Sequence, residues 1–136
     1  LVYGTANKMS RSNIALWAVD ALKSGKELKI VNDQYRTPTL AEDLAQGCYL
    51  LTTNKSQGIY NVAGPDYISI IDLVMKIGEV FELETSQIKS LSSAELNQPA
   101  NRPPKTGLDL SKIYSEVDYR PHTLDQGLRL LRQQLS

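Results

Sequence analysis

The stretch "NDQYRTPTLAEDLA", residues 32–45, decides how the chain passes from a polar loop into a helix. Pro38 fixes its own φ and biases Thr37 toward an extended conformation. Thr39 and Glu42 stand three residues apart, the spacing of a capping box, in which each side chain accepts a hydrogen bond from the backbone N–H of the other residue. We therefore predict a helix that begins at Thr39 and that the chain enters from one fixed direction.

Arg36 stands just ahead of this predicted helix N-terminus. Free N–H groups and the helix dipole favour an anion at such a place, and a guanidinium adds five donors to it. Because Pro38 stiffens the adjoining chain, Arg36 is expected to be held in place. A solvated surface charge is equally compatible with these residues, so both interpretations stay open at this point.

Segments with helical and strand patterns alternate on both sides of this stretch. Trp17 falls on the apolar face of one predicted helix, which Gly25 ends, and it is expected to pack in the core. The alternation predicts an α/β (mixed α+β) fold, and residues 1–136 contain no linker or repeat, so we expect a single region. The expected helices lie within residues 10–25, 39–53, 69–81, 110–117 and 123–135, and the expected strands within 1–4, 27–31, 58–64 and 86–91.

The composition limits which partners the chain can attract. The 136 residues are 41% hydrophobic and carry 15 Lys and Arg against 15 Asp and Glu. Zero net charge argues against a nucleic-acid or membrane partner held by overall electrostatic attraction. No apolar run approaches the ~20 residues that a spanning helix needs. We expect a cytoplasmic protein whose single cysteine, Cys48, is a small core residue.

Several kinds of active site are missing from the sequence. His122 is the single histidine, so neither a Ser-His-Asp triad nor a histidine-rich metal site can form, and a turn or cap role is expected for it. The eight glycines form neither a G-x-G-x-x-G motif nor a G-x-x-x-x-G-K phosphate loop. This segment alone is therefore not expected to bind a dinucleotide cofactor.

Arg102 is a second arginine in a constrained loop, since Pro103 and Pro104 follow it directly. Two such arginines that face one pocket suit a diphosphate, because each guanidinium can donate two charge-assisted hydrogen bonds to phosphate oxygens. The sequence therefore favours an anion site made by Arg36 and Arg102. A structural bond from Arg102 to nearby carbonyl groups is the alternative.

Five stretches together carry a family resemblance: "LVYG", "GKELKIVNDQYRTPT", "EDLA", "GIYNVAG" and "ANRPPKTGLDLSKI". In their order and spacing the chain resembles, over nearly its whole length, the C-terminal part of dTDP-4-dehydrorhamnose reductases, which belong to the extended short-chain dehydrogenase/reductase superfamily. The resemblance implies a two-part enzyme in which an upstream Rossmann domain holds NADP(H) or NAD(H) and carries the catalytic Tyr-x-x-x-Lys. No tyrosine of this chain has a lysine four residues later, and the first residue is Leu1 rather than a methionine, so we expect the chain to begin within a longer protein. We therefore expect a C-terminal substrate-binding segment that holds neither catalytic residues nor a cofactor.

The same resemblance implies a nucleotide-sugar substrate. Arg36 and Arg102 fall on the positions of two arginines that contact the substrate diphosphate in the superfamily, and Asn13 lies in the stretch that lines the sugar end. A helix cap is the alternative role for Asn13. Leu1 stands where these reductases often have a tryptophan. Apolar surface on the first strand and helix is expected to pack on the upstream domain, and self-association, for example as a homodimer, is expected where that surface is exposed.

Three functions are compatible with the resemblance. The first, which we favour, is NAD(P)H-dependent reduction of dTDP-4-dehydrorhamnose or a similar nucleoside-diphosphate 4-keto-6-deoxyhexose. The second is a regulatory binding subunit similar to the beta subunit of methionine adenosyltransferase, which has a similar "RP-x-N-x-x-LD-x-SK" segment. The third is a nucleotide-sugar epimerase or dehydratase, which would form product without net consumption of the cofactor.

Overall fold

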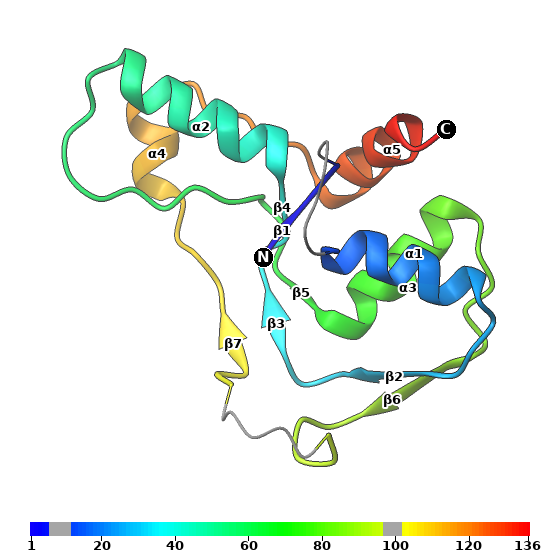
Figure 1. The fold of residues 1–136 in the computed structure, drawn as a ribbon. Helices are drawn as coiled ribbons and strands as arrows, with labels where there is room; N and C mark the ends of the chain where they lie inside the picture. The colour runs from blue at the N-terminus through cyan, green and yellow to red at the C-terminus, as the bar shows by residue number, and fades with distance from the viewer. Residues whose placement is uncertain (6–11, 97–101) are drawn as a thin grey trace.

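In the computed structural model, which describes residues 1–5, 12–96 and 102–136, helices and short strands alternate along the chain (Figure 1). The helices are α1 (Ile14–Lys23), α2 (Ala41–Thr53), α3 (Ile70–Phe81), α4 (Ser111–Glu116) and α5 (Leu124–Gln134). The strands are β1 (Val2–Tyr3), β2 (Leu28–Val31), β3 (Tyr35–Arg36), β4 (Thr39–Leu40), β5 (Ile68–Ser69), β6 (Ile88–Leu91) and β7 (Lys105–Thr106).

The main core lies where α3 packs against both α1 and α5 (Figure 1). α3 turns an apolar face inward, because its buried residues recur at helical spacing. Each fully buried leucine or isoleucine here contributes about 1.5–3 kcal/mol relative to an exposed one. The most buried side chains of this core include Ala18, Leu73, Val74, Ile77, Leu128 and Leu131.

Short strands hold the loops that surround this core. β1 pairs with β4 and β2 with β6, both in parallel. β3 is the middle strand of a third sheet, antiparallel to β5 and parallel to β7, with Tyr35 opposite Lys105 and Arg36 opposite Thr106. Segments that lie far apart in the sequence therefore meet at Arg36.

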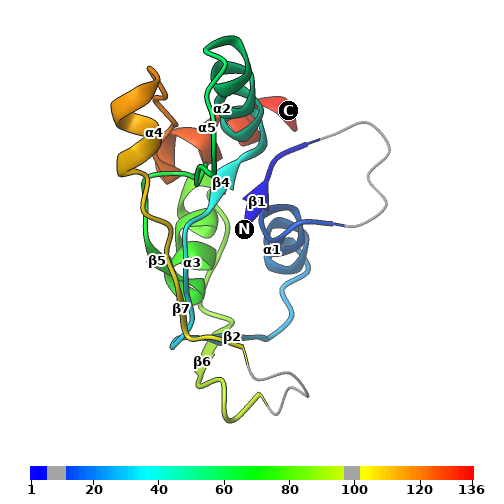
Figure 2. The same ribbon diagram turned by 90° about the vertical axis from the view of Figure 1, so that its left-hand side faces the viewer.

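A second, smaller cluster joins α2 to α4, which lie beside each other in both views (Figures 1 and 2). Ile113 of α4 is completely buried, and Tyr119 after it is 3% exposed. Gly47 of α2 lets these groups approach, because a Cβ at this position would overlap the side chain of Val62. The phenol of Tyr119 donates a hydrogen bond to the carbonyl oxygen of Ala63 at 3.0 Å, which fixes the chain between the two helices.

The mixed α/β class and most of the predicted elements are confirmed. The strands predicted within residues 27–31 and 86–91 are β2 and β6. Ser69 caps α3 by accepting from the backbone N–H of Asp72, and Thr123 and Gln126 form the predicted capping box of α5. Gly25 follows the end of α1 with a φ of +65°, a conformation that suits glycine.

The capping box predicted for Thr39 and Glu42 is wrong. α2 begins at Ala41, and Leu40 precedes it without a side-chain cap. Thr39 instead belongs to β4, where its hydroxyl donates to the carbonyl oxygen of Thr37 at 3.2 Å and accepts from the backbone N–H of Gly64 at 3.1 Å. The local cap does not form because its groups have other partners: the Thr39 hydroxyl bonds to Thr37 and Gly64, and the Thr39 backbone N–H donates to Leu1 in the pairing with β1.

Three further expectations are also wrong. Residues 58–64 form no strand, because backbone carbonyl groups of this segment bond to side chains instead. Lys112 Nζ donates to the carbonyl oxygen of Ile59 at 3.1 Å, and the Tyr119 hydroxyl donates to that of Ala63 at 3.0 Å. Trp17 is 44% exposed, although its helix packs as predicted, because it lies beside the buried face of α1 rather than on it. Cys48 is exposed, since the buried positions of α2 are Asp43 and Gly47.

None of the described helices combines the length and apolar character that a membrane span requires.

Candidate functional site

Arg36 is half-buried on β3 and is held by acceptors from two separate segments. Its Nη1 donates to the carbonyl oxygen of Tyr35 at 2.7 Å and to that of Pro104 at 3.2 Å. Its Nη2 donates to Gln34 Oε1 at 3.0 Å. The expectation of a held arginine is therefore confirmed, and the interpretation as a freely solvated surface charge is wrong.

These bonds leave part of the Arg36 guanidinium available. The group has five N–H donors, and three hydrogen bonds to described residues use three of them. Within residues 1–5, 12–96 and 102–136, no carboxylate forms an ion pair with Arg36. A positive charge with two remaining donors can donate hydrogen bonds to the oxygens of an anion.

The pairing of β3 with β7 brings the Arg102 loop to Arg36. The backbone N–H of Tyr35 donates to the carbonyl oxygen of Pro104 at 2.7 Å, and Pro104 is the second residue after Arg102. Arg102 itself is exposed, and its guanidinium forms no hydrogen bond with the other described residues. The two stiffened loops thus lie beside each other, as a shared anion site requires, and Arg36 binds carbonyl oxygens of both segments. The anion-binding role of Arg102 and its alternative both stay predictions.

Asn13 acts as the N-cap of α1. Its Oδ1 accepts from the backbone N–H groups of Ala15 at 3.1 Å and Leu16 at 3.2 Å, and its Nδ2 donates to the carbonyl oxygen of Gly4 at 2.8 Å. The helix-cap role considered for Asn13 is confirmed. Because both ends of its amide have partners, any contact between Asn13 and a substrate sugar stays a prediction.

The start of β1 lies near the same site. Thr39 donates its backbone N–H to the carbonyl oxygen of Leu1 at 2.9 Å, and Leu1 and Val2 are 44% and 46% exposed. Exposed apolar side chains therefore lie at this edge, as expected for a first strand that packs on an upstream domain.

Two aromatic rings extend the site beyond the residues singled out in the sequence. The rings of Tyr35 and Tyr67 lie 5.6 Å apart between centroids, and Tyr67 is 48% exposed. Gly107, which follows β7, leaves the space that the ring of Tyr67 occupies. An exposed ring next to an arginine can stack on a planar group such as a base. No sequence signal identified Tyr67, because it approaches Tyr35 only through the pairing of β5 with β3.

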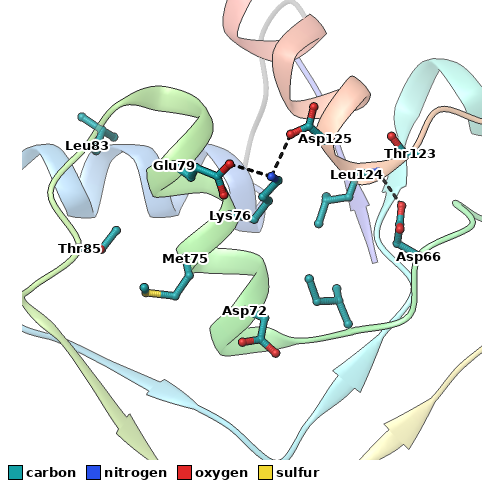
Figure 3. A pocket seen from close by; sticks show the side chains of 11 residues that line it. Asp66, Asp72, Met75, Lys76, Glu79, Leu83, Thr85, Thr123, Leu124 and Asp125 are labelled. Atoms are coloured by element: carbon teal, nitrogen blue, oxygen red, sulfur yellow. Dashed lines mark hydrogen bonds and ion pairs between the residues drawn. The ribbon is translucent and has the colours of Figure 1, made fainter.

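A pocket of about 540 Å³ lies elsewhere, between α3 and the first turn of α5 (Figure 3). Figure 3 shows Lys76 between two carboxylates, and its Nζ lies 2.9 Å from both Glu79 Oε1 and Asp125 Oδ1. Asp66 and Asp72 add two more carboxylates to the lining. This excess of negative charge opposes a diphosphate, so we do not assign the predicted anion site to this pocket.

Among the side chains that the structure describes, no group of three or more His, Cys, Asp and Glu residues could hold a metal ion. The N-termini of α1, α3 and α5 do not resemble a dinucleotide cradle, because the side chains of Asn13, Ser69 and Thr123 already cap them. We assign no residue of this chain to a nicotinamide cofactor.

Comparison with known proteins gives a family model that matches residues 1–136 and is described as the RmlD substrate binding domain. The chain is 29% identical over 120 residues to the probable low-salt glycan biosynthesis reductase Agl14 of Haloferax volcanii, a match that covers 88% of this chain and 40% of the relative. It is 26% identical over 118 residues to the beta subunit of methionine adenosyltransferase 2 from Xenopus laevis, covering 83% of this chain and 35% of the relative.

A solved structure has the same fold. The dTDP-4-dehydrorhamnose reductase of Bacillus anthracis, determined in complex with NADP, superposes with a TM-score of 0.86 at 20% identity, over 98% of this chain and 46% of that one. The chain therefore spans less than half the length of these relatives.

Proposed function

Since the chain belongs to the RmlD substrate binding domain family, we propose that it is the nucleotide-sugar-binding portion of an NAD(P)H-dependent reductase. The proposed substrate is dTDP-4-dehydrorhamnose or a similar nucleoside-diphosphate 4-keto-6-deoxyhexose. The relatives named as reductases support this assignment, as does the resemblance of the sequence to the C-terminal part of such enzymes. We further propose that residues 1–136 form one substrate-binding region of a longer cytoplasmic protein, which can associate as a homodimer.

One observation carries the proposal: the hydrogen bonds from Tyr35 and Arg36 to Pro104 join the two loops that contain Arg36 and Arg102. The net charge of the chain is zero, so attraction for a dianion must come from local groups such as these. In the proposed complex, Arg36 and Arg102 donate to the diphosphate oxygens. Asn13 is the proposed contact toward the sugar.

The cofactor belongs to the upstream part in this proposal. NADP(H) or NAD(H) supplies the hydride that reduces the sugar ketone, and the residues described here bind and orient the substrate. The 136-residue chain alone is accordingly expected to bind the nucleotide-sugar substrate without catalysing its reduction. Purification of this chain and an assay for NADPH and NADH oxidation tests that expectation, and turnover above the background rate would contradict it.

The methionine adenosyltransferase beta subunit supports a second candidate function, a regulatory binding subunit, because that relative matches 83% of this chain. A test on the full-length protein separates the two candidates. The reductase proposal expects stoichiometric NAD(P)H oxidation with dTDP-4-keto-6-deoxyglucose or dTDP-4-dehydrorhamnose. A regulatory subunit would give no turnover and would bind a methionine adenosyltransferase catalytic subunit in a pull-down. Product formation without net cofactor oxidation would instead indicate an epimerase or dehydratase.

A further inference from the structure

Gln34 is a buried polar side chain, 6% exposed, between Arg36 and Ser93. Its Oε1 accepts from Arg36 Nη2 at 3.0 Å, and its Nε2 donates to Ser93 Oγ at 2.8 Å. The Ser93 hydroxyl donates in turn to Asp33 Oδ1 at 2.6 Å. Three hydrogen bonds therefore connect the Asp33 carboxylate to the Arg36 guanidinium, and we call these four residues the Asp33–Arg36 relay.

The charges at its two ends fix the direction of every bond in the relay. A carboxylate only accepts and a guanidinium only donates. The single hydroxyl proton of Ser93 goes to Asp33, so its oxygen accepts from the amide nitrogen of Gln34. That orientation turns the amide oxygen of Gln34 toward Arg36. Because all the bonds point the same way, each polarises the next, and the relay resists reorientation more than isolated bonds would.

The Asp33 end is firmly anchored. Besides the hydroxyl, the backbone N–H of Ser93 donates to Asp33 Oδ2 at 2.9 Å. These bonds from Ser93 hold the pKa of Asp33 below its ordinary value. The carboxylate therefore stays charged at neutral pH, as the direction of the relay requires.

The Arg36 end reaches the second arginine loop. While Nη2 is bound by Gln34, Nη1 donates to the carbonyl oxygen of Pro104 at 3.2 Å. A guanidinium is planar, so fixing Nη2 also fixes the position of Nη1 and of the donors that remain. The relay consequently restrains both Arg36 and the chain two residues after Arg102.

We propose that Asp33, Ser93 and Gln34 are positioning residues for the substrate diphosphate, and that they act by holding Arg36 in one orientation beside the Arg102 loop. This inference rests on the proposed function, because it gives a purpose to the Arg36 orientation at that same site. Positioning of this kind raises affinity, since the ligand does not have to order a mobile side chain on binding.

The test uses Ser93→Ala in the full-length protein, which removes the middle of the relay and leaves Arg36 and Gln34 in place. Ser90→Ala is the matched control, because Ser90 Oγ accepts from Asn32 Nδ2 at 2.8 Å between the same two segments but outside the relay. Calorimetric titration with dTDP should give about tenfold weaker binding for Ser93→Ala, a loss of about 1.4 kcal/mol, and wild-type affinity for Ser90→Ala. Ser93→Thr keeps the hydroxyl and should restore affinity.

A double-mutant cycle distinguishes positioning from general damage. If Ser93 acts through Arg36, adding Ser93→Ala to Arg36→Ala should weaken dTDP binding no further. Additive losses, or wild-type affinity in Ser93→Ala, would overturn the proposal.

A measurement without ligand separates this inference from the proposed function. Nitrogen-15 NMR of the Arg36 guanidinium should show slower rotation about the Nε–Cζ bond in the wild type and in Ser90→Ala than in Ser93→Ala. Equal rotation in all three proteins would overturn the relay. Unchanged dTDP affinity in Arg36→Ala would instead show that Arg36 does not bind the diphosphate.

Discussion

Asp43 is 4% exposed, and its carboxylate accepts two hydrogen bonds from His122, one from the backbone N–H at 2.9 Å and one from the ring Nδ1 at 2.7 Å. Asp43 lies in the first turn of α2, where the helix dipole also stabilises negative charge. The pair connects α2 to the segment that leads into α5. The single histidine of the chain therefore has a structural role, which agrees with the turn role predicted for it.

Loss of this connection should be costly. Asp43→Ala leaves a backbone donor of His122 without its partner, so the free energy of unfolding should fall by about 1–3 kcal/mol. Urea denaturation followed by circular dichroism measures the change. Gln46→Ala is the matched control, because Gln46 is exposed on the same helix, and its effect should stay within about 0.5 kcal/mol. Equal effects of the two substitutions would show that burial of Asp43 does not matter.

A close contact between β1 and α5 gives a second prediction. A Cβ at Gly127 would overlap the hydroxyl of Tyr3, a residue that is 2% exposed. Gly127→Ala should therefore destabilise the chain by about 1–3 kcal/mol, although alanine favours a helix more than glycine does. Tyr3→Phe removes the overlapping hydroxyl, so the double variant should be more stable than Gly127→Ala alone. Thermal unfolding of the wild type, the two single variants and the double variant gives a double-mutant cycle. Strictly additive losses of stability would disprove the steric cause.

Asp125 gives a prediction about acid stability. Hydrogen bonds from Arg129 and then Lys76 lower the pKa of Asp125 to about 2, from an ordinary value of 3.8. Because the folded state lowers this pKa, the carboxylate stabilises the fold above pH 3.8, and that stabilisation disappears as the pH falls toward 2. As the pH falls from 3.8 to 2, the Asp125→Asn variant should therefore lose less stability than the wild type.

Thermal midpoints measured from pH 5 to pH 2 test this difference. The side chain of Asp125 is 36% exposed, so solvent keeps the effect small, and added salt should reduce it further. Asp20→Asn, a change at an exposed residue of α1, is the control and should follow the wild-type curve. If the thermal midpoints of Asp125→Asn also followed those of the wild type at every pH, the ion pairs of Asp125 would contribute nothing measurable to stability.

The sequence predicted elements well where their signals are local. Thr123 and Gln126 satisfy each other within one turn, and the predicted capping box forms. Thr39 and Glu42 have the same spacing, yet their box does not form, because Thr39 bonds to Gly64, 25 positions away. Periodicity located α1 but did not show that Trp17 would remain 44% exposed. Distant partners decided these outcomes, and a local pattern does not contain them.

Distant partners also decide how the candidate site is assembled. Arg36 and Arg102 could be selected because proline stiffens both of their loops. The closeness of these two segments depends on the parallel pairing of β3 with β7, which joins residues 68 positions apart at the Arg36–Pro104 bond. Gln34 was not singled out, because its importance comes from Ser93, 59 positions away. Residue type and stiffness can therefore be read from sequence, whereas the assembly of a site from several segments requires the fold.

The last prediction concerns the two arginines as a clamp on the substrate diphosphate in the full-length protein. Each can make charge-assisted hydrogen bonds to phosphate oxygens, so replacing either with alanine should cost on the order of 1.5–3 kcal/mol of binding, roughly ten- to a hundredfold in affinity. Lysine should restore binding only in part, because it lacks the planar fork of donors. Affinity for NAD(P)H should change little, since the cofactor is proposed to bind upstream.

Calorimetric titration of the wild type, Arg36→Ala, Arg102→Ala and the double variant with dTDP and with a dTDP-sugar provides the measurement. Arg120→Ala is the control, because Arg120 is an exposed arginine whose Nε pairs with Asp118 at 2.6 Å, outside the candidate site. Wild-type affinity in Arg102→Ala would exclude the clamp. A loss confined to Arg102→Ala would leave Arg36 with the structural role that its bonds to Tyr35 and Pro104 already give it, and the diphosphate would then depend on one arginine.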